Sequence, residues 1–98
     1  MPLSTSQRRY LRSSAHALKP VILLGARGIT DSVLAELGRA LDHHELVKIR
    51  LAGTDRAARG AQVDALLAAS GAELVQQIGH IATLYRRNPD APRLALPR

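Results

Sequence analysis

The sequence has 98 residues, 46% of them hydrophobic, which suffices for one domain whose core buries roughly two-thirds of the surface of the unfolded chain. The absence of cysteine excludes disulfide bonds, thiolate metal sites and cysteine nucleophiles, and no apolar run approaches the roughly twenty residues of a membrane span. The net charge of +6 favours a polyanionic partner, and we expect a single domain over 1–98 in the cytoplasm.

The first element is a helix that begins at Ser4 and ends near His16. Ser4 and Gln7 have the spacing of a capping box, and Pro20 turns the chain out of helical geometry. An apolar stripe predicts a core contact through Leu11, Ala15 and Leu18. A neighbouring face carries Arg8, Arg9 and Arg12. This acid-free segment also fits a mitochondrial transit peptide, but its capped helix and the strand that follows argue against that interpretation.

The next elements are a strand, a glycine turn, a helix and a second strand. The apolar run 21–24 predicts a buried strand, and Gly25-Ala26-Arg27-Gly28 follows it directly. A helix begins at Thr30 or Asp31, both good N-caps, and its apolar positions repeat with helical period until about His43. The alternation over 46–52 predicts a half-buried strand with Lys48 and Arg50 on its outer face.

The last third of the chain predicts a helix and a hairpin. Thr54-Asp55 caps an alanine-rich helix that ends at Gly71, and strands over 74–78 and 81–86 flank the turn Gly79-His80. The segment 88–98 contains three prolines and predicts an extended tail. The order is α-β-α-β-α-β-β, which indicates an α/β domain with one layer of helices against a sheet.

Positive charge is concentrated at the two ends of the chain. Residues 1–28 contain five basic side chains and no acid, whereas 29–73 contain five basic and seven acidic side chains. Residues 74–98 contain four arginines and one aspartate. If the fold brings the ends together, they form one basic face of the kind that binds polyanions.

The tetrad Gly25-Ala26-Arg27-Gly28 is the motif with the clearest chemistry. Glycines allow backbone amides to approach a ligand closely, and the helix that follows points free N–H groups at the same place. Arg27 can add a bidentate hydrogen bond to a phosphate. The alternative is a tight turn without a ligand, because glycines at this spacing between a strand and a helix are common.

A metal site is the main rival among chemical sites. His43-His44-Glu45 offers potential ligands, with His16 and His80 as distant partners. Adjacent histidines point in different directions, and no His-x-x-x-His spacing occurs. A histidine at the end of a helix is also favoured by the helix dipole. The sequence therefore predicts no metal, no cofactor and no catalytic residues.

The whole chain resembles the YhbY-type proteins, the stand-alone form of the CRM domain (chloroplast RNA splicing and ribosome maturation). The resembling stretches run from end to end: 3–4, 17–25, 28–30, 33–36, 43–48, 78–79, 84–86 and 96–98. The resemblance implies a four-stranded mixed sheet with three helices, similar to the C-terminal domain of bacterial translation initiation factor three. It also implies RNA binding through the GxxG loop, and association with precursors of the large ribosomal subunit. His80 stands where relatives often have lysine, which makes any contact there pH-dependent.

The composition predicts how RNA is held. With no Phe or Trp and only Tyr10 and Tyr85, the chain cannot build an aromatic platform for bases, so it should grip the backbone of structured RNA. Tyr85 is more typical of packing than of stacking, and Arg93 and Arg98 of solvated side chains. The residues expected to contact RNA are Gly25, Ala26, Arg27 and Gly28, then Arg8, Arg9, Arg12 and Lys19, then Arg86 and Arg87.

We expect a monomer when the protein is free, with ribosomal RNA as its partner and no membrane. The alternative function is a ribosome-associated protein-interaction module or translation factor that touches RNA only incidentally.

Overall fold

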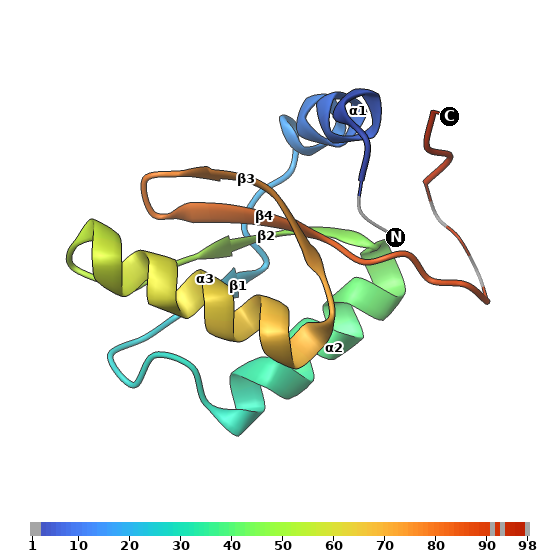
Figure 1. Ribbon diagram of the computed structural model, residues 1–98. Helices are drawn as coiled ribbons and strands as arrows, with labels where there is room; N and C mark the ends of the chain where they lie inside the picture. Colours follow the sequence, from blue (N-terminus) through green and yellow to red (C-terminus); the bar gives the residue numbers. More distant parts are fainter. Residues whose placement is uncertain (1–2, 91, 93, 98) are drawn as a thin grey trace.

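The computed structural model describes residues 3–90, 92 and 94–97, and its elements follow the predicted order (Figure 1). The helices and strands are α1 (Thr5–Ala15), β1 (Ile22–Leu23), α2 (Asp31–His44), β2 (Leu46–Arg50), α3 (Arg56–Ser70), β3 (Glu73–Ile78) and β4 (Ile81–Tyr85). Local capping explains why the helix boundaries agree so closely with the sequence. The capping box of Ser4 and Gln7 is present, Thr30 and Asp55 cap α2 and α3, and Gly71 ends α3 in the left-handed region.

The four strands form one mixed sheet in the order β1-β2-β4-β3. β1 runs parallel to β2, while β4 is antiparallel to both of its neighbours. β3 and β4 form the predicted hairpin, and Gly79 takes a positive φ of 56° in its turn. The architecture of three helices and a four-stranded mixed sheet in one domain is confirmed.

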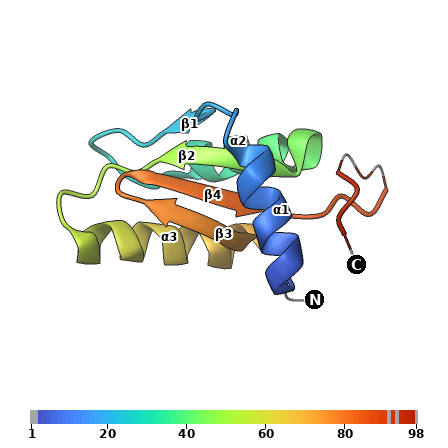
Figure 2. The ribbon, with the colours of Figure 1, turned by 90° about the horizontal axis from the view of Figure 1, so that it is seen from above.

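The helices lie on both faces of the sheet rather than in a single layer. α2 and α3 cover one face, over a core that includes Leu37, Ile49 and Leu66. α1 crosses the opposite face at one end of the strands, where Leu11 and Ala15 pack on residues that include Leu46, Val75 and Tyr85 (Figure 2). The single layer was wrong because both faces of this end of the sheet are apolar. In the described part of the chain, no helix covers the rest of the second face (Figure 2).

Two predictions of burial are corrected by this arrangement. Leu18 is 41% exposed, because α1 ends at Ala15 and Leu18 belongs to the turn that follows, where its N–H donates to the Ala15 carbonyl at 2.9 Å. The run 21–24 is not buried throughout: Ile22 and Leu24 face the core, but Val21 and Leu23 are 50% and 66% exposed. β1 is an edge strand, which pairs with β2 on one side and with no strand of the described chain on the other.

The described residues of the C-terminal segment form no helix or strand, yet they are fixed to the domain. The buried carboxylate of Glu45 accepts hydrogen bonds from the amides of Asn88 at 2.7 Å and Leu94 at 2.8 Å. Leu94 and Leu96 pack against the cluster under α1, and Gln7 donates to the Pro97 carbonyl at 3.0 Å. No helix in the described part of the chain is long and apolar enough to cross a membrane.

Candidate functional site

The GARG loop, Gly25 to Gly28, leaves the end of β1 as a tight turn with an exposed tip. The N–H of Gly28 donates to the Gly25 carbonyl at 2.9 Å, and Gly28 takes a φ of 67°. Ala26 and Arg27 form the tip and are exposed. Within the described chain, the amides of Ala26 and Arg27 have no backbone acceptor, so both can donate to a ligand.

The helix after the loop contributes less than the sequence indicated. Ile29 and Thr30 separate the turn from α2, and the Thr30 hydroxyl accepts from the Val33 amide at 3.2 Å. Asp31 adds a carboxylate to the first turn. This charge opposes an anion at the helix start, so Arg27 is the main source of attraction at the loop.

The loop packs beside the start of α3. A Cβ built on Gly28 would lie 3.8 Å from Gln62 Nε2, and the side-chain oxygen of Gln62 accepts from the amides of Ala52 and Gly53 at 3.1 and 3.2 Å. At Gly53 a Cβ would come within 2.7 Å of the Arg59 amide nitrogen, so only glycine lets this segment lie so close to α3. Gln62 of α3 thus lies beside Gly28 and also holds the segment that contains Gly53.

Two groups of basic residues near the loop were missed by the sequence analysis. Arg56 and Arg59 line a polar hollow of about 310 Å³ with Gly79 of the hairpin. Lys48 and Arg50 stand on the open face of the sheet, and the Arg50 carbonyl accepts from the amide of Leu24, just before the loop, at 2.9 Å. Their signal was available, because the strand alternation had already placed Lys48 and Arg50 on the outer face. The net negative charge of segment 29–73 obscured them.

The arginines of α1 divide into one structural and two exposed residues. The guanidinium of Arg8 donates to the Leu74 carbonyl and ties α1 to β3. Arg9 and Arg12 are exposed, as is Lys19 after the helix. Arg9, Arg12 and Lys19 therefore remain accessible to a ligand.

Arg86, one of the predicted RNA contacts, is held inside the domain by hydrogen bonds from its side chain. Its guanidinium donates to the carbonyl of Ser70 at 2.7 Å, to the carbonyl of Gly38 at 3.2 Å and to Asp42 Oδ1 at 2.8 Å. These bonds join the end of β4 to α2 and α3. Arg87, one residue later, is exposed beside α1. Arg93 and Arg98 lie outside the described residues.

The basic residues form two clusters rather than the single face proposed from the sequence. The chain ends do meet, because α1 packs near Tyr85 at the end of β4. The GARG loop lies at the other end of the sheet, beyond Arg50 (Figure 2). Leu46 under α1 and Arg50 near the loop are four residues apart, or about 13 Å along the strand. Lys48 lies between the two clusters on the open face, and Arg50 belongs to the cluster at the loop.

The burial of Tyr85 agrees with the sequence interpretation of this residue as a packing residue. The pKa of the Tyr85 phenol is raised from its usual value of 10. The larger cause is burial, and the negative charge of the nearby Glu45 is the second. His43 and His44 contact each other edge to face at 5.2 Å between ring centroids. In the described ranges, no group of three or more His, Cys, Asp or Glu side chains is placed to hold a metal ion.

The sequence profile of the CRS1 / YhbY (CRM) domain matches residues 3–86. This chain belongs to that family. A Haemophilus influenzae protein named as an RNA-binding protein is 46% identical over 96 residues, covering 98% of this chain and 96% of its own. A probable RNA-binding protein of Pseudomonas aeruginosa is 47% identical over 89 residues, covering 91% of this chain and 86% of its own.

A solved structure shares the fold. The solution structure of a hypothetical Staphylococcus aureus protein, described as a candidate RNA-binding protein, superimposes on this CRM domain with a TM-score of 0.83 at 30% identity. The match covers 98% of this chain and 100% of the other. Family membership, expected from the resemblance, is therefore confirmed.

Proposed function

We propose that this CRM-family protein binds structured ribosomal RNA by its phosphate backbone, with the GARG loop at the centre of the contact. The observation that carries the proposal is the exposed tip of the turn, where Arg27 stands and where the amides of Ala26 and Arg27 have no backbone acceptor among the described residues. A phosphate held there gains backbone hydrogen bonds and a charge-assisted pair in one place. The RNA-binding names of the relatives support the same ligand.

The basic residues elsewhere suit a folded RNA. Arg9, Arg12 and Lys19 form one cluster beside α1, and the loop with Arg50 forms another at the far end of the sheet. Clusters this far apart can hold phosphates from different strands of one folded molecule. Because Tyr85 is buried, the exposed aromatic surface is small, and most of the contact is to the backbone.

The biological setting of the proposal follows from family resemblance. We place the protein in the cytoplasm, as a monomer when free, on precursors of the large ribosomal subunit. The role is binding without a chemical step, and it needs no metal or cofactor.

The test is to map crosslinks between the protein and RNA in cells and to sediment the lysate. We expect crosslinks in large-subunit ribosomal RNA from the tip of the GARG loop, and co-sedimentation with large-subunit precursors. Protein found only at the top of the gradient would contradict the ribosomal role. Absence of any RNA crosslink would contradict RNA binding itself.

The alternative is a protein-interaction module on the ribosome, and one observation favours it. Leu23 and Ile78 are each 66% exposed on the open face of the sheet. A salt wash of isolated particles separates the two functions, because backbone contacts to RNA weaken steeply with salt and apolar contacts do not. Release at high salt, and loss of association in Arg27→Ala but not in Leu23→Ser, supports the RNA contact.

A further inference from the structure

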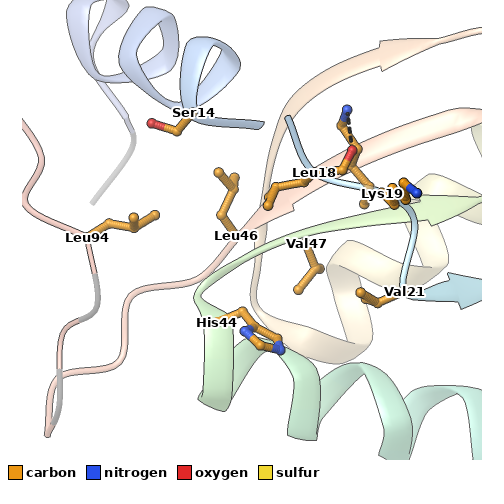
Figure 3. Close-up of a pocket in the computed structure, with 9 residues that line it drawn as sticks. Ser14, Leu18, Lys19, Val21, His44, Leu46, Val47 and Leu94 are labelled. Atoms are coloured by element: carbon orange, nitrogen blue, oxygen red, sulfur yellow. Dashed lines mark hydrogen bonds between the residues drawn. The ribbon is translucent and has the colours of Figure 1, made fainter. Parts of the chain in front are cut away.

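A cavity of about 360 Å³ lies where α1, β1, β2 and α2 approach one another (Figure 3). Its walls are mainly apolar and include Leu18, Val21, Leu46 and Val47. The volume lies within the range of small-ligand sites, about 300–1,000 Å³. Of the residues proposed above to bind RNA phosphate, Lys19 lines this cavity, while the GARG loop, Arg9, Arg12 and Arg50 do not.

The cavity exists because β1 is too short to cover β2. β1 pairs with Ile49 and Arg50, and before them Val21 donates to the Lys48 carbonyl at 3.0 Å. The backbone groups of odd-numbered residues along β2 point toward β4. The flanking residues show this pattern, because the Glu45 carbonyl accepts from the Arg86 amide at 2.9 Å and the Leu51 amide donates to the His80 carbonyl at 2.6 Å. The peptide groups of Leu46 therefore face the side on which β1 would continue. Their N–H and C=O can serve as donor and acceptor for a ligand.

The rim of the cavity is basic. Lys19 is exposed there, and Lys48 Nζ donates to the Leu18 carbonyl at 3.1 Å, the contact drawn as a dashed line in Figure 3. The imidazole of His44, at the end of α2, lies on the opposite side, and Ser14 of α1 adds a hydroxyl. No Asp or Glu is among the lining residues that the structure describes. The site thus combines apolar walls, peptide hydrogen-bonding groups and positive charge.

We propose that this cavity, the nucleobase site, receives one unpaired base of the bound RNA. The faces of the base pack against Leu18 and Val21, its edge bonds to the peptide groups of Leu46, and Lys19 and Lys48 bind the flanking phosphates. The proposal rests on RNA as the ligand and adds a base-specific contact to the backbone grip. An extended peptide fits less well, because strand addition needs a longer edge than 46–48 and a peptide has no repeated negative charge for the two lysines.

Two ligand series test the nucleobase site. Methyl NMR spectra are recorded with the four nucleoside monophosphates and with ribose phosphate, which lacks the base. We expect the methyl signals of Leu18, Val21 and Val47 to shift with nucleotides but not with ribose phosphate. Equal shifts from ribose phosphate, or none from any nucleotide, would overturn the proposal. Shifts caused only by an extended apolar peptide would assign the cavity to a protein partner instead.

The second series uses the RNA segment that crosslink mapping identifies. Its unpaired nucleotide is either intact or abasic. Packing of the base faces against apolar side chains favours the intact RNA, which should bind on the order of 10-fold more tightly than the abasic RNA. Leu18→Trp fills the cavity and should abolish this preference. Leu23→Trp, which places the same ring on the open sheet outside the cavity, is the matched control and should retain it.

The same measurements distinguish failure of the base contact from failure of the proposed function. If the wild-type protein binds intact and abasic RNA equally, the nucleobase site is wrong while RNA binding stands. If it binds neither RNA, both proposals are wrong. Arg27→Ala should weaken binding to both RNAs by the same factor, because it removes a phosphate contact and leaves the cavity intact.

Discussion

The two glycines of the GARG loop should respond differently to the same substitution. Gly28 has a φ of 67°, in the region that side chains disfavour, whereas Gly25 has no positive φ. A Cβ at Gly25 meets no described atom within 4 Å, and one at Gly28 meets only Gln62 Nε2 at 3.8 Å. The difference between Gly25→Ala and Gly28→Ala is therefore a difference in backbone conformation and not in packing.

The magnitudes follow from the backbone. Placing alanine in the left-handed region costs about 1–2 kcal/mol, and loss of flexibility in the unfolded chain returns about 0.4–1 kcal/mol. Gly28→Ala should thus lower the free energy of unfolding by about 1 kcal/mol. Gly25→Ala should leave it unchanged or raise it by about 0.5 kcal/mol. Urea unfolding followed by circular dichroism measures both values.

RNA binding supplies the second readout of this pair. Both methyl groups lie in the turn and hinder the approach of a phosphate to the amides, so both variants should bind RNA more weakly. Gly25→Ala then loses affinity without losing stability. A loss of stability equal to that of Gly28→Ala would refute the conformational argument, and unchanged RNA affinity in Gly25→Ala would count against phosphate binding at the loop.

Three further predictions concern the support of the domain. Glu45→Ala removes the buried acceptor of the Asn88 and Leu94 amides, at 2.7 and 2.8 Å, and should lower the free energy of unfolding by about 2–5 kcal/mol. Hydrogen exchange of the Leu94 amide should become faster, and an unchanged exchange rate would contradict this anchor. Arg86→Met should cost about 1–3 kcal/mol and leave the salt dependence of RNA binding intact; a shallower slope would return Arg86 to the interface. The raised pKa of Tyr85 means that the unfolded chain ionises first, so stability should be present below pH 10 and fall as pH rises through the higher folded pKa. Phenolate absorbance measures the ionisation of Tyr85, and urea unfolding at several pH values measures the stability, with Tyr85→Phe as the control. An identical dependence of stability on pH in Tyr85→Phe would exclude Tyr85 as the cause.

Local chemistry explains which elements the sequence predicted. The caps at Ser4, Thr30 and Asp55 depend on residues within three positions, and the structure has all of them. The bonds of Arg86 could not be inferred, because Asp42 and Ser70 are far from it in the sequence. The sequence around an arginine at the end of a strand looks the same whether its side chain is solvated or bonded to neighbouring helices.

Burial and charge clustering depended on the placement of α1. The apolar run 21–24 was expected to be a buried strand, but α1 covers only the end of the sheet that carries Leu46. The same placement separates the α1 arginines from the GARG loop. Neither result follows from periodicity, which indicates a helix face but not which end of which sheet face that helix covers.

The measurement that tests the central claim most directly is the salt dependence of binding to a ribosomal RNA fragment for the wild-type protein, Arg27→Ala and Arg39→Ala. Arg39 is an exposed arginine on α2, outside both basic clusters, and serves as the matched control. With Arg27 on a phosphate, its loss should make the slope of log affinity against log salt concentration shallower by about one unit, while Arg39→Ala keeps the wild-type slope. Wild-type slope and affinity in Arg27→Ala would contradict the assignment of the GARG loop as the phosphate site.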